Sequence, residues 1–300
     1  MNIKGISSLL AYSLLIGTLG FFTRAVQGLD LITIVFFRAF LAAIFIFGFA
    51  AVTKTLKDLI PSNIPTLVLA SICQCGMMVL FIGAVLNTSI ANAVFINQIA
   101  PICAVLFSRV FLGEKISRTT LIGMLISTTG VLCMLDLGSL EFGSNSAIGD
   151  LMALGSAVCY AGAMVSSKSL TRTNSTTSIA FWQMALSAAM LVPFIQIPSS
   201  TILIEGAGPL LGIGFLVSGF GYLLFMVGVK NLNAQTVLII PSFGLVVPAA
   251  GAWLLYGETL ATTGFIGCGL ILAGVLSSQI KFQEAAPAPV PTTSGALQPA

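Results

Sequence analysis

The chain repeats itself at an offset of 144 residues. This displacement places Gly5 on Gly149, Arg24 on Lys168, Asn87 on Asn231, Gly113-Glu114 on Gly257-Glu258, and Gly123 and Gly130 on Gly267 and Gly274. Each copy also contains five long apolar runs, which is an odd number. Two copies that each cross a membrane an odd number of times are inserted in opposite orientations, an arrangement found in many secondary transporters.

The composition indicates that these runs lie in a lipid bilayer. Hydrophobic residues make up 57% of the 300 residues, charged residues only 7%, and the mean hydropathy is +1.07. A soluble domain has about 25% charged residues. Because one crossing takes about 20 residues, the chain has room for about ten crossings with short loops, and no large soluble domain fits.

The expected architecture follows from the positions of the apolar runs. They lie at about 6–27, 32–53, 66–86, 90–113, 120–138, 149–169, 177–196, 208–230, 234–257 and 262–280. Backbone amides need partners in lipid, so runs of this length form helices. We therefore expect an all-α polytopic membrane protein with ten transmembrane helices in two inverted five-helix repeats, at 1–138 and 149–281, followed by a disordered cytoplasmic tail at 285–300.

The distribution of basic residues predicts the orientation. With the N-terminus inside, the inner segments hold ten of the twelve Lys and Arg residues, the outer segments hold only Arg24, and Arg38 lies within the second helix. Positively charged loops stay on the cytoplasmic side. We therefore expect a multi-pass protein of the cytoplasmic membrane with both termini in the cytoplasm.

Cysteine and histidine usage argues against metal or redox chemistry. All six cysteines fall inside apolar runs, and the chain has no histidine. Cys73-x-Cys75 has neither a zinc nor a redox spacing, so we interpret the cysteines as small buried residues. We expect no cofactor and no metal. The formal net charge of +3 is too small to suggest nucleic acid.

Several motifs carry a family resemblance. They are Phe36-Phe37-Arg38, Pro101 followed by Gly113-Glu114, Phe181-Trp182-Gln183, and Trp253 with Gly257-Glu258 at the end of helix 9. Over residues 1 to about 281 the chain resembles the EamA branch of the drug/metabolite transporter superfamily. The resemblance implies a ten-helix fold whose central cavity is lined by helices 1, 3, 4, 6, 8 and 9. It identifies no substrate.

Arg38 lies about six residues into the second helix, roughly 9–10 Å below the membrane surface at about 1.5 Å per residue. A charge at that depth needs a partner or a wet cavity. Arg38 either attracts a carboxylate or phosphate of the substrate or pairs with helix carbonyls and stabilises packing. The second reading is favoured because the resemblance places helix 2 beside the cavity and not on its main wall.

No acidic residue lies at mid-membrane depth, since all nine are in predicted loops or at helix ends. Coupling through a buried acid is therefore not supported, and facilitated diffusion or exchange remains. Glu114 and Glu258 either take part in coupling and gating or end helices 4 and 9 at the interface, and we favour the second.

Amides and prolines indicate a site near the membrane midplane. Helix 4 carries Asn92, Asn97 and Gln98 before Pro101, and helix 9 carries Pro241, Ser242 and Pro248. Buried amides require hydrogen-bond partners, and prolines interrupt helices. Helices broken at matching positions in two repeats point to a midplane site. Simple kinks with polar helix packing are the alternative.

Four further residues complete the predicted substrate site, and each also has a pure packing interpretation. They are Tyr12 in helix 1, Gln74 in helix 3, Tyr160 in helix 6 and Tyr222 in helix 8. A mostly apolar cavity with a few hydroxyls and amides suits a small amphipathic metabolite. Gly123 and Gly130, repeated as Gly267 and Gly274, predict a tight helix contact within the fold or, alternatively, a homodimer interface.

These features together predict a carrier that works by alternating access. The expected substrate is a small organic metabolite, an amino acid or a related compound, moved outward. Uptake or exchange of an anionic or nucleotide-like metabolite is the alternative. A membrane enzyme finds no support, because neither a buried carboxylate pair nor a metal-ligand cluster occurs. A scaffold that transports nothing is a third reading.

Overall fold

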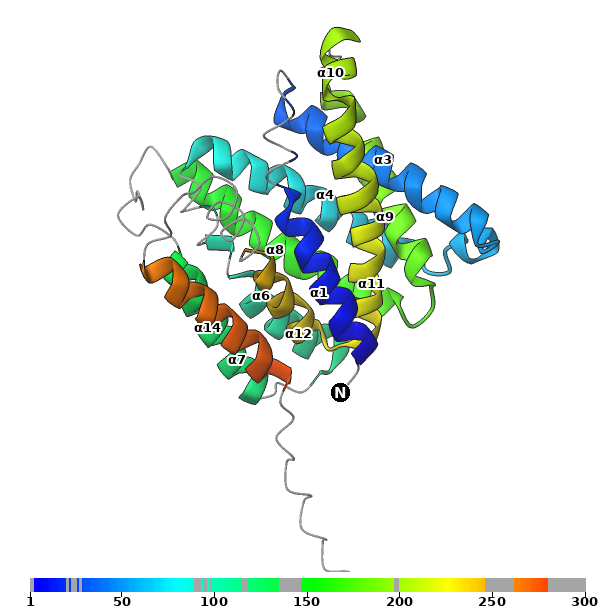
Figure 1. Ribbon diagram of the computed structural model, residues 1–300. Coiled ribbons are helices and arrows are strands. Elements are labelled where there is room, and N and C mark those ends of the chain that lie inside the picture. Colours follow the sequence, from blue (N-terminus) through cyan, green and yellow to red (C-terminus); the bar gives the residue numbers. More distant parts are fainter. Residues whose placement is uncertain are drawn as a thin grey trace, which may run out of the picture.

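The computed structural model describes residues 3–19, 22, 26, 29–88, 93, 96–97, 99–114, 118–134, 147–196, 200–245 and 262–279. Within these residues the chain forms helices and short turns and no strand (Figure 1). The expectation of an all-α polytopic membrane protein is confirmed.

The first repeat contains α1 (Ile3–Gly17), α3 (Leu31–Val52), η1 (Leu56–Leu59), α4 (Ile64–Asn87), α6 (Ala100–Phe107), the π-helical η2 (Ser108–Leu112) and α7 (Arg118–Met134). The second contains α8 (Ala147–Leu170), α9 (Thr176–Leu191), η4 (Val192–Phe194), α10 (Ser200–Leu211), the π-helical η5 (Gly212–Phe220), α11 (Gly221–Asn231), α12 (Ala234–Ile239), η6 (Ile240–Leu245) and α14 (Thr262–Gln279).

Five of the described helices are long and apolar enough to cross a membrane: Ile32–Val52, Ile64–Ala84, Ala147–Leu170, Thr176–Phe194 and Gly206–Asn231. Four shorter apolar helices lie in further predicted crossings: Ile3–Gly17, Ala100–Leu112, Leu121–Cys133 and Phe265–Ser277. The predicted ninth run, 234–257, is described only as far as residue 245. The count of ten crossings therefore stays a prediction.

The close contact of α7 with α14 demonstrates that the repeats are inverted. A Cβ atom on Gly130 would lie 2.7 Å from the carbonyl oxygen of Gly267, and one on Gly274 would lie 2.6 Å from that of Gly123. Residue numbers thus rise along one helix where they fall along the other, so the two helices are antiparallel (Figure 1). Because α7 and α14 are equivalent helices of the two copies, the copies point in opposite directions.

The same contact shows what the repeated glycines do within the fold. Glycine removes the side chain at the crossing and lets the two backbones approach within a distance that a methyl group would block. The predicted tight contact within the fold is confirmed, and a homodimer interface stays an untested alternative.

Contacts between the repeats are reciprocal, as a two-fold relation requires. A Cβ atom on Gly5 of α1 would lie 2.8 Å from Leu232, just beyond α11, and one on Gly149 of α8 would lie 2.7 Å from Thr88, just beyond α4. Gly149 and Leu232 are the positions of Gly5 and Thr88 displaced by 144 residues. Each repeat therefore buries its first helix against the third helix of the other.

Two helix boundaries differ from the predictions. The first helix, predicted over 6–27, is interrupted at Thr18, whose amide and hydroxyl both donate to the carbonyl of Leu15. Leu19 and Phe22 are helical again and Val26 is not, while the residues between them and residue 27 lie outside the described part of the chain. The eighth, predicted to begin at 208, is helical from Ser200. Hydropathy detects only the part of a helix that contacts lipid, and a helix extending into water keeps its backbone hydrogen bonds there.

Candidate functional site

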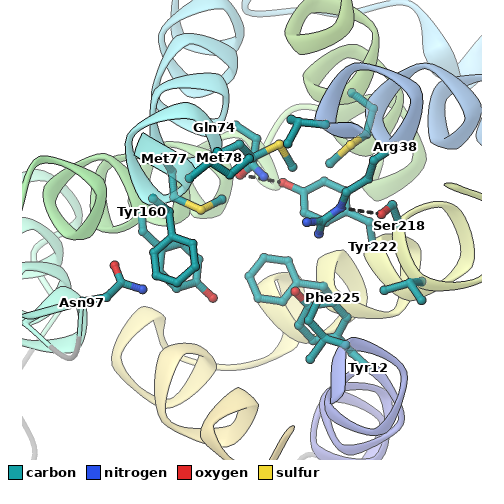
Figure 2. A pocket seen from close by; sticks show the side chains of 16 residues that line it. Tyr12, Arg38, Gln74, Met77, Met78, Asn97, Tyr160, Ser218, Tyr222 and Phe225 are labelled. Atoms are coloured by element: carbon teal, nitrogen blue, oxygen red, sulfur yellow. Dashed lines mark hydrogen bonds between the residues drawn. The ribbon is translucent and has the colours of Figure 1, made fainter. Parts of the chain in front are cut away.

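A cavity of about 230 Å³ lies between the two repeats. It is bounded by side chains of α1, α3, α4, α8, α9, η5 and α11, together with Asn97 (Figure 2). Most of the wall is apolar, with methionine, phenylalanine and aliphatic side chains. The structure therefore provides an internal space with a few polar groups.

The two repeats contribute equivalent positions to the cavity, as expected if it lies at the pseudo-two-fold axis that relates them. Four pairs of its lining residues are 144 positions apart: Ile16 and Tyr160, Gln74 and Ser218, Met78 and Tyr222, and Phe81 and Phe225. In two of these pairs an apolar residue of the first repeat corresponds to a tyrosine of the second. The site is therefore symmetric in position and asymmetric in chemistry, so it can recognise a solute with two different ends.

Six of the nine predicted substrate-binding residues line this one cavity: Tyr12, Arg38, Gln74, Asn97, Tyr160 and Tyr222. Ser242 lies in η6, which packs against α1, and is not among the lining residues. Asn92 and Gln98 lie outside the described residues. Contact of any of these side chains with a substrate stays a prediction.

Arg38 projects from α3 into the cavity wall (Figure 2). Its Nε donates a 2.7 Å hydrogen bond to the hydroxyl of Ser218 in η5. Among the described residues that line the cavity, Arg38 alone is charged. The arrangement corrects the expectation that helix 2 stands off the main wall, because Val35 and Arg38 of α3 both line the cavity, beside the η5 backbone that packs closely against α3.

The walls differ from the expected set in a second respect. Met184 of α9, in the seventh predicted helix, also lines the cavity, whereas none of the described residues of the ninth does. Helices 2 and 7 are equivalent in the two repeats, and each contributes side chains to the cavity wall.

A buried polar chain runs from α8 to the cavity. The Ser167 hydroxyl donates to the carbonyl of Ala163, and Gln183 Nε2 donates to Ser167 Oγ over 2.8 Å. The Tyr222 hydroxyl donates to Gln183 Oε1 over 2.6 Å and also lies 3.3 Å from Gln74 Oε1. Gln183 is fully buried. In the sequence Gln183 stands out only as part of the Phe181-Trp182-Gln183 motif, although an amide within an apolar run is itself an indication of a buried hydrogen bond.

Aromatic rings form another part of the cavity wall. The Tyr12 and Phe225 ring centroids are 5.0 Å apart, and Tyr222 stacks on Phe225 at 5.6 Å. Asn97 borders the cavity, and its Oδ1 is buried without a hydrogen-bond partner among the described residues. A polar group that has no partner is costly to bury, and a hydrogen-bond donor inside the cavity would offset that cost for Asn97.

The predicted helix-break residues are placed only in part. Pro101 is buried in the first turn of α6, where its missing N–H costs no hydrogen bond, and Pro241 lies in η6, where the chain tightens from α to 3₁₀ geometry. Gly113 ends η2 in the left-handed conformation at φ 67°, so Glu114 directly follows the end of helix 4, as predicted. Pro248 and Glu258 lie outside the described residues.

Lys168 holds a second polar contact between helices. Its ammonium group donates to the carbonyls of Val229, Lys230 and Leu232 over 2.8, 3.1 and 2.6 Å. These carbonyls lie at the C-terminal end of α11, where the last helix carbonyls have no partner within the helix and the helix dipole is negative. Lys168 thus ties the end of α8 to the end of α11.

Known proteins with similar sequences are transporters. The model of the EamA-like transporter family matches this chain twice, over residues 3–136 and 147–278. A protein of Archaeoglobus fulgidus named as an uncharacterized transporter is 27% identical over 91% of this chain and 95% of its own length. The pseudopaline exporter CntI of Pseudomonas aeruginosa is 25% identical over 81% of this chain and 84% of its own length.

The fold is also known from experiment. A solved crystal structure superposes with a TM-score of 0.76 at 18% identity and covers 92% of this chain and 96% of its own. At that identity the likeness concerns the fold. Because the family model covers both repeats, this polytopic membrane protein belongs to the EamA-like transporter family of the drug/metabolite transporter superfamily.

Proposed function

We propose that this transporter exports a small organic metabolite that carries a carboxylate, an amino acid or a related compound, by alternating access. The observation that carries the proposal is Arg38, a guanidinium that faces a cavity with no acidic residue among its described lining residues. The proposed location is the cytoplasmic membrane with both termini inside, which rests on the distribution of basic residues.

Charge balance supports an anionic group on the solute. A charged side chain at the centre of a membrane helix costs about 2.5–3.5 kcal/mol on insertion scales. Ser218 accepts from Nε, and no hydrogen bond joins the two Nη groups to another described residue. Those groups form a planar fork that matches a carboxylate, and such charge-assisted bonds are among the strongest in proteins. An arriving anion would therefore offset the cost of the buried charge.

The size and lining of the cavity support a small solute. Sites for drug-sized ligands have volumes of about 300–1,000 Å³. The cavity here, at about 230 Å³, is smaller, and its walls are mainly methionine and aromatic side chains. An amphipathic metabolite of amino-acid size fits that description better than a nucleotide-like compound does.

Inverted repeats support alternating access. The reciprocal contacts of the two copies allow each to take up the packing of the other, which would open the cavity to the opposite side. The outward direction is supported by the name of one relative, the pseudopaline exporter of Pseudomonas aeruginosa. The name of that relative supports only the direction of transport and not the identity of the substrate.

Counterflow in liposomes tests the proposal. Purified protein is reconstituted and screened with labelled amino acids, organic anions and nucleosides, and liposomes without protein serve as the blank. Arg38→Gln should then reduce transport of solutes that carry a carboxylate, amino acids included, by about 10- to 100-fold, the equivalent of about 1.5–3 kcal/mol for a hydrogen bond to a charged group. Nucleosides, which carry no carboxylate, should lose much less. Equal loss for all solutes would assign Arg38 to folding and refute its role in recognition.

A further inference from the structure

The polar chain behind the cavity has a fixed direction. The carbonyl of Ala163 only accepts hydrogen bonds, so the Ser167 hydroxyl gives its one proton to it. Ser167 Oγ can then only accept from Gln183, which must present its NH₂ group. The other end of the Gln183 amide, Oε1, consequently points at Tyr222 and can only accept. No choice of direction remains for Gln183.

This direction determines what Tyr222 can do next. A phenol hydroxyl has a single proton, and the 2.6 Å contact to Gln183 Oε1 takes it. Toward Gln74, 3.3 Å away, the Tyr222 oxygen can therefore only accept. The oxygen and nitrogen of an amide occupy equivalent positions that a half-turn exchanges. Gln74 can donate to the Tyr222 oxygen by turning its NH₂ group toward it, and its carbonyl oxygen is then the amide atom without a partner.

Gln74 borders the cavity, and only one of its two amide atoms has a hydrogen-bond partner among the described residues. Tyr222 lies between Gln74 and Arg38, so an acceptor and a cation border the same space on two sides of one tyrosine (Figure 2). Aromatic faces of Tyr222 and Phe225 lie beside them and attract ammonium groups.

We propose that Gln183 is a positioning residue that, through Tyr222, holds the Gln74 carbonyl toward the cavity and thereby selects zwitterionic solutes. Such a solute brings an anionic group for Arg38 and an ammonium or other N–H donor for Gln74, as a free amino acid does. The inference rests on the proposed function and narrows its substrate class. A plain carboxylate satisfies Arg38 alone and leaves the Gln74 acceptor unpaired.

Removal of Gln183 should invert this preference. In Gln183→Met the Tyr222 proton has no acceptor on α9, so the hydroxyl donates to Gln74 Oε1, which is 3.3 Å away. The Gln74 NH₂ group then faces the cavity and repels the ammonium group. Tyr222→Phe frees Gln74 to rotate, so it should reduce the preference for the amino acid without inverting it. Because this substitution nearly conserves the volume of the side chain, it also tests the inference if Gln183→Met fails to fold.

Matched solutes measure the effect. L-Leucine, L-phenylalanine and L-glutamate are each compared with the same acid lacking the amino group: 4-methylpentanoate, 3-phenylpropanoate and glutarate. The readout is the apparent Kd from ligand-induced shifts in the melting temperature of the full chain in detergent. For at least one pair the amino acid should bind about tenfold more tightly, because an unpaired buried acceptor is costly. In Gln183→Met the ratio should fall to one or below, while the acid alone keeps its affinity within about twofold.

Ser187→Ala is the control. Ser187 lies one turn beyond Gln183 on α9, is fully buried, and its hydroxyl has no partner among the described residues, so its loss leaves the polar chain intact. The control should keep the wild-type ratio. Retention of the amino-acid preference in both Gln183→Met and Tyr222→Phe would overturn the inference, and so would equal binding of acid and amino acid by the wild type.

The two proposals fail in different ways. Binding of the carboxylic acids that depends on Arg38 but shows no preference for the amino group would overturn only the role of Gln183. Absence of binding for every pair, together with no effect of Arg38→Gln on any transported solute, would overturn the proposed function and this inference with it.

Discussion

The contact between α7 and α14 allows the effect of Gly→Ala substitutions on stability to be predicted, with a control position on the same helix. Gly130 and Gly274 are equivalent residues on opposite sides of this contact, and a Cβ atom on either would lie within 2.7 Å of backbone atoms of the other helix. Gly269 lies on α14 as well, but a Cβ atom there would meet nothing within 4 Å. The three positions share the same substitution, Gly→Ala, and differ in the space around it.

The magnitudes follow from two opposing effects. Alanine stabilises a helix interior by about 1 kcal/mol relative to glycine. Forcing an added methyl into packed backbone costs about 1–3 kcal/mol and sometimes more. Here the obstructing atoms include backbone atoms on both sides, among them the carbonyl oxygens of Gly123 and Gly267, which cannot rotate away as a side chain can. We therefore expect Gly269→Ala to be neutral or stabilising, and Gly130→Ala and Gly274→Ala to be destabilising.

The assay is thermal unfolding of the full chain in detergent, followed by intrinsic fluorescence. A loss of about 1–2 kcal/mol corresponds to a fall in Tm of about 2–8 °C. Gly130→Ala and Gly274→Ala should fall by similar amounts because their surroundings are related by the two-fold. Equal behaviour of Gly269→Ala and Gly274→Ala would refute the interpretation of α7 and α14 as a backbone-to-backbone contact.

Three further changes test single local features by the same measurement of unfolding. Lys168→Met removes three hydrogen bonds to the end of α11 and should cost about 2–3 kcal/mol, whereas Lys230→Met, at an exposed side chain beside it, should cost little. Gly113→Ala puts a side chain at φ 67° and should cost about 1–2 kcal/mol; no loss there would mean that the helix end relaxes. Asp30→Ala removes the side-chain acceptor for the amide of Thr33 at the start of α3 and should cost about 1 kcal/mol, and Asp30→Asn, which can still accept, should recover most of it.

The repeat geometry explains why one site can be both buried and asymmetric. Met78 and Tyr222 occupy equivalent places, as do Ile16 and Tyr160, and in both pairs the second repeat supplies the hydroxyl. The backbone symmetry needed for an inverted carrier is therefore kept, while the side chains at the axis have diverged. Under the proposed function this divergence would allow the cavity to distinguish the two ends of a solute, because a strictly symmetric cavity would bind both ends in the same way.

The amino-acid sequence alone determined the class of fold and the relation of its halves. Apolar runs of about 20 residues form helices in lipid, because their backbone amides need hydrogen-bond partners there. An odd number of such runs in a repeated unit means that the two copies are inverted. The repeated glycines Gly123, Gly130, Gly267 and Gly274 also predicted a tight helix contact, because a seven-residue spacing keeps two glycines on one helix face, although the sequence left open whether that contact lies within the fold or in a homodimer. These conclusions depend on periodicity and solvent, which act along the chain.

Only the tertiary structure decided which polar residues share a space. Arg38 enters the cavity because η5 lies against α3, and Gln183 matters because Ser167 and Tyr222 lie on either side of it. Ser242, equally plausible by position, is not among the residues that line the cavity. The direction of a side chain around its helix, and the partner it meets there, depend on how several helices pack at once, and no local pattern in the sequence carries that information.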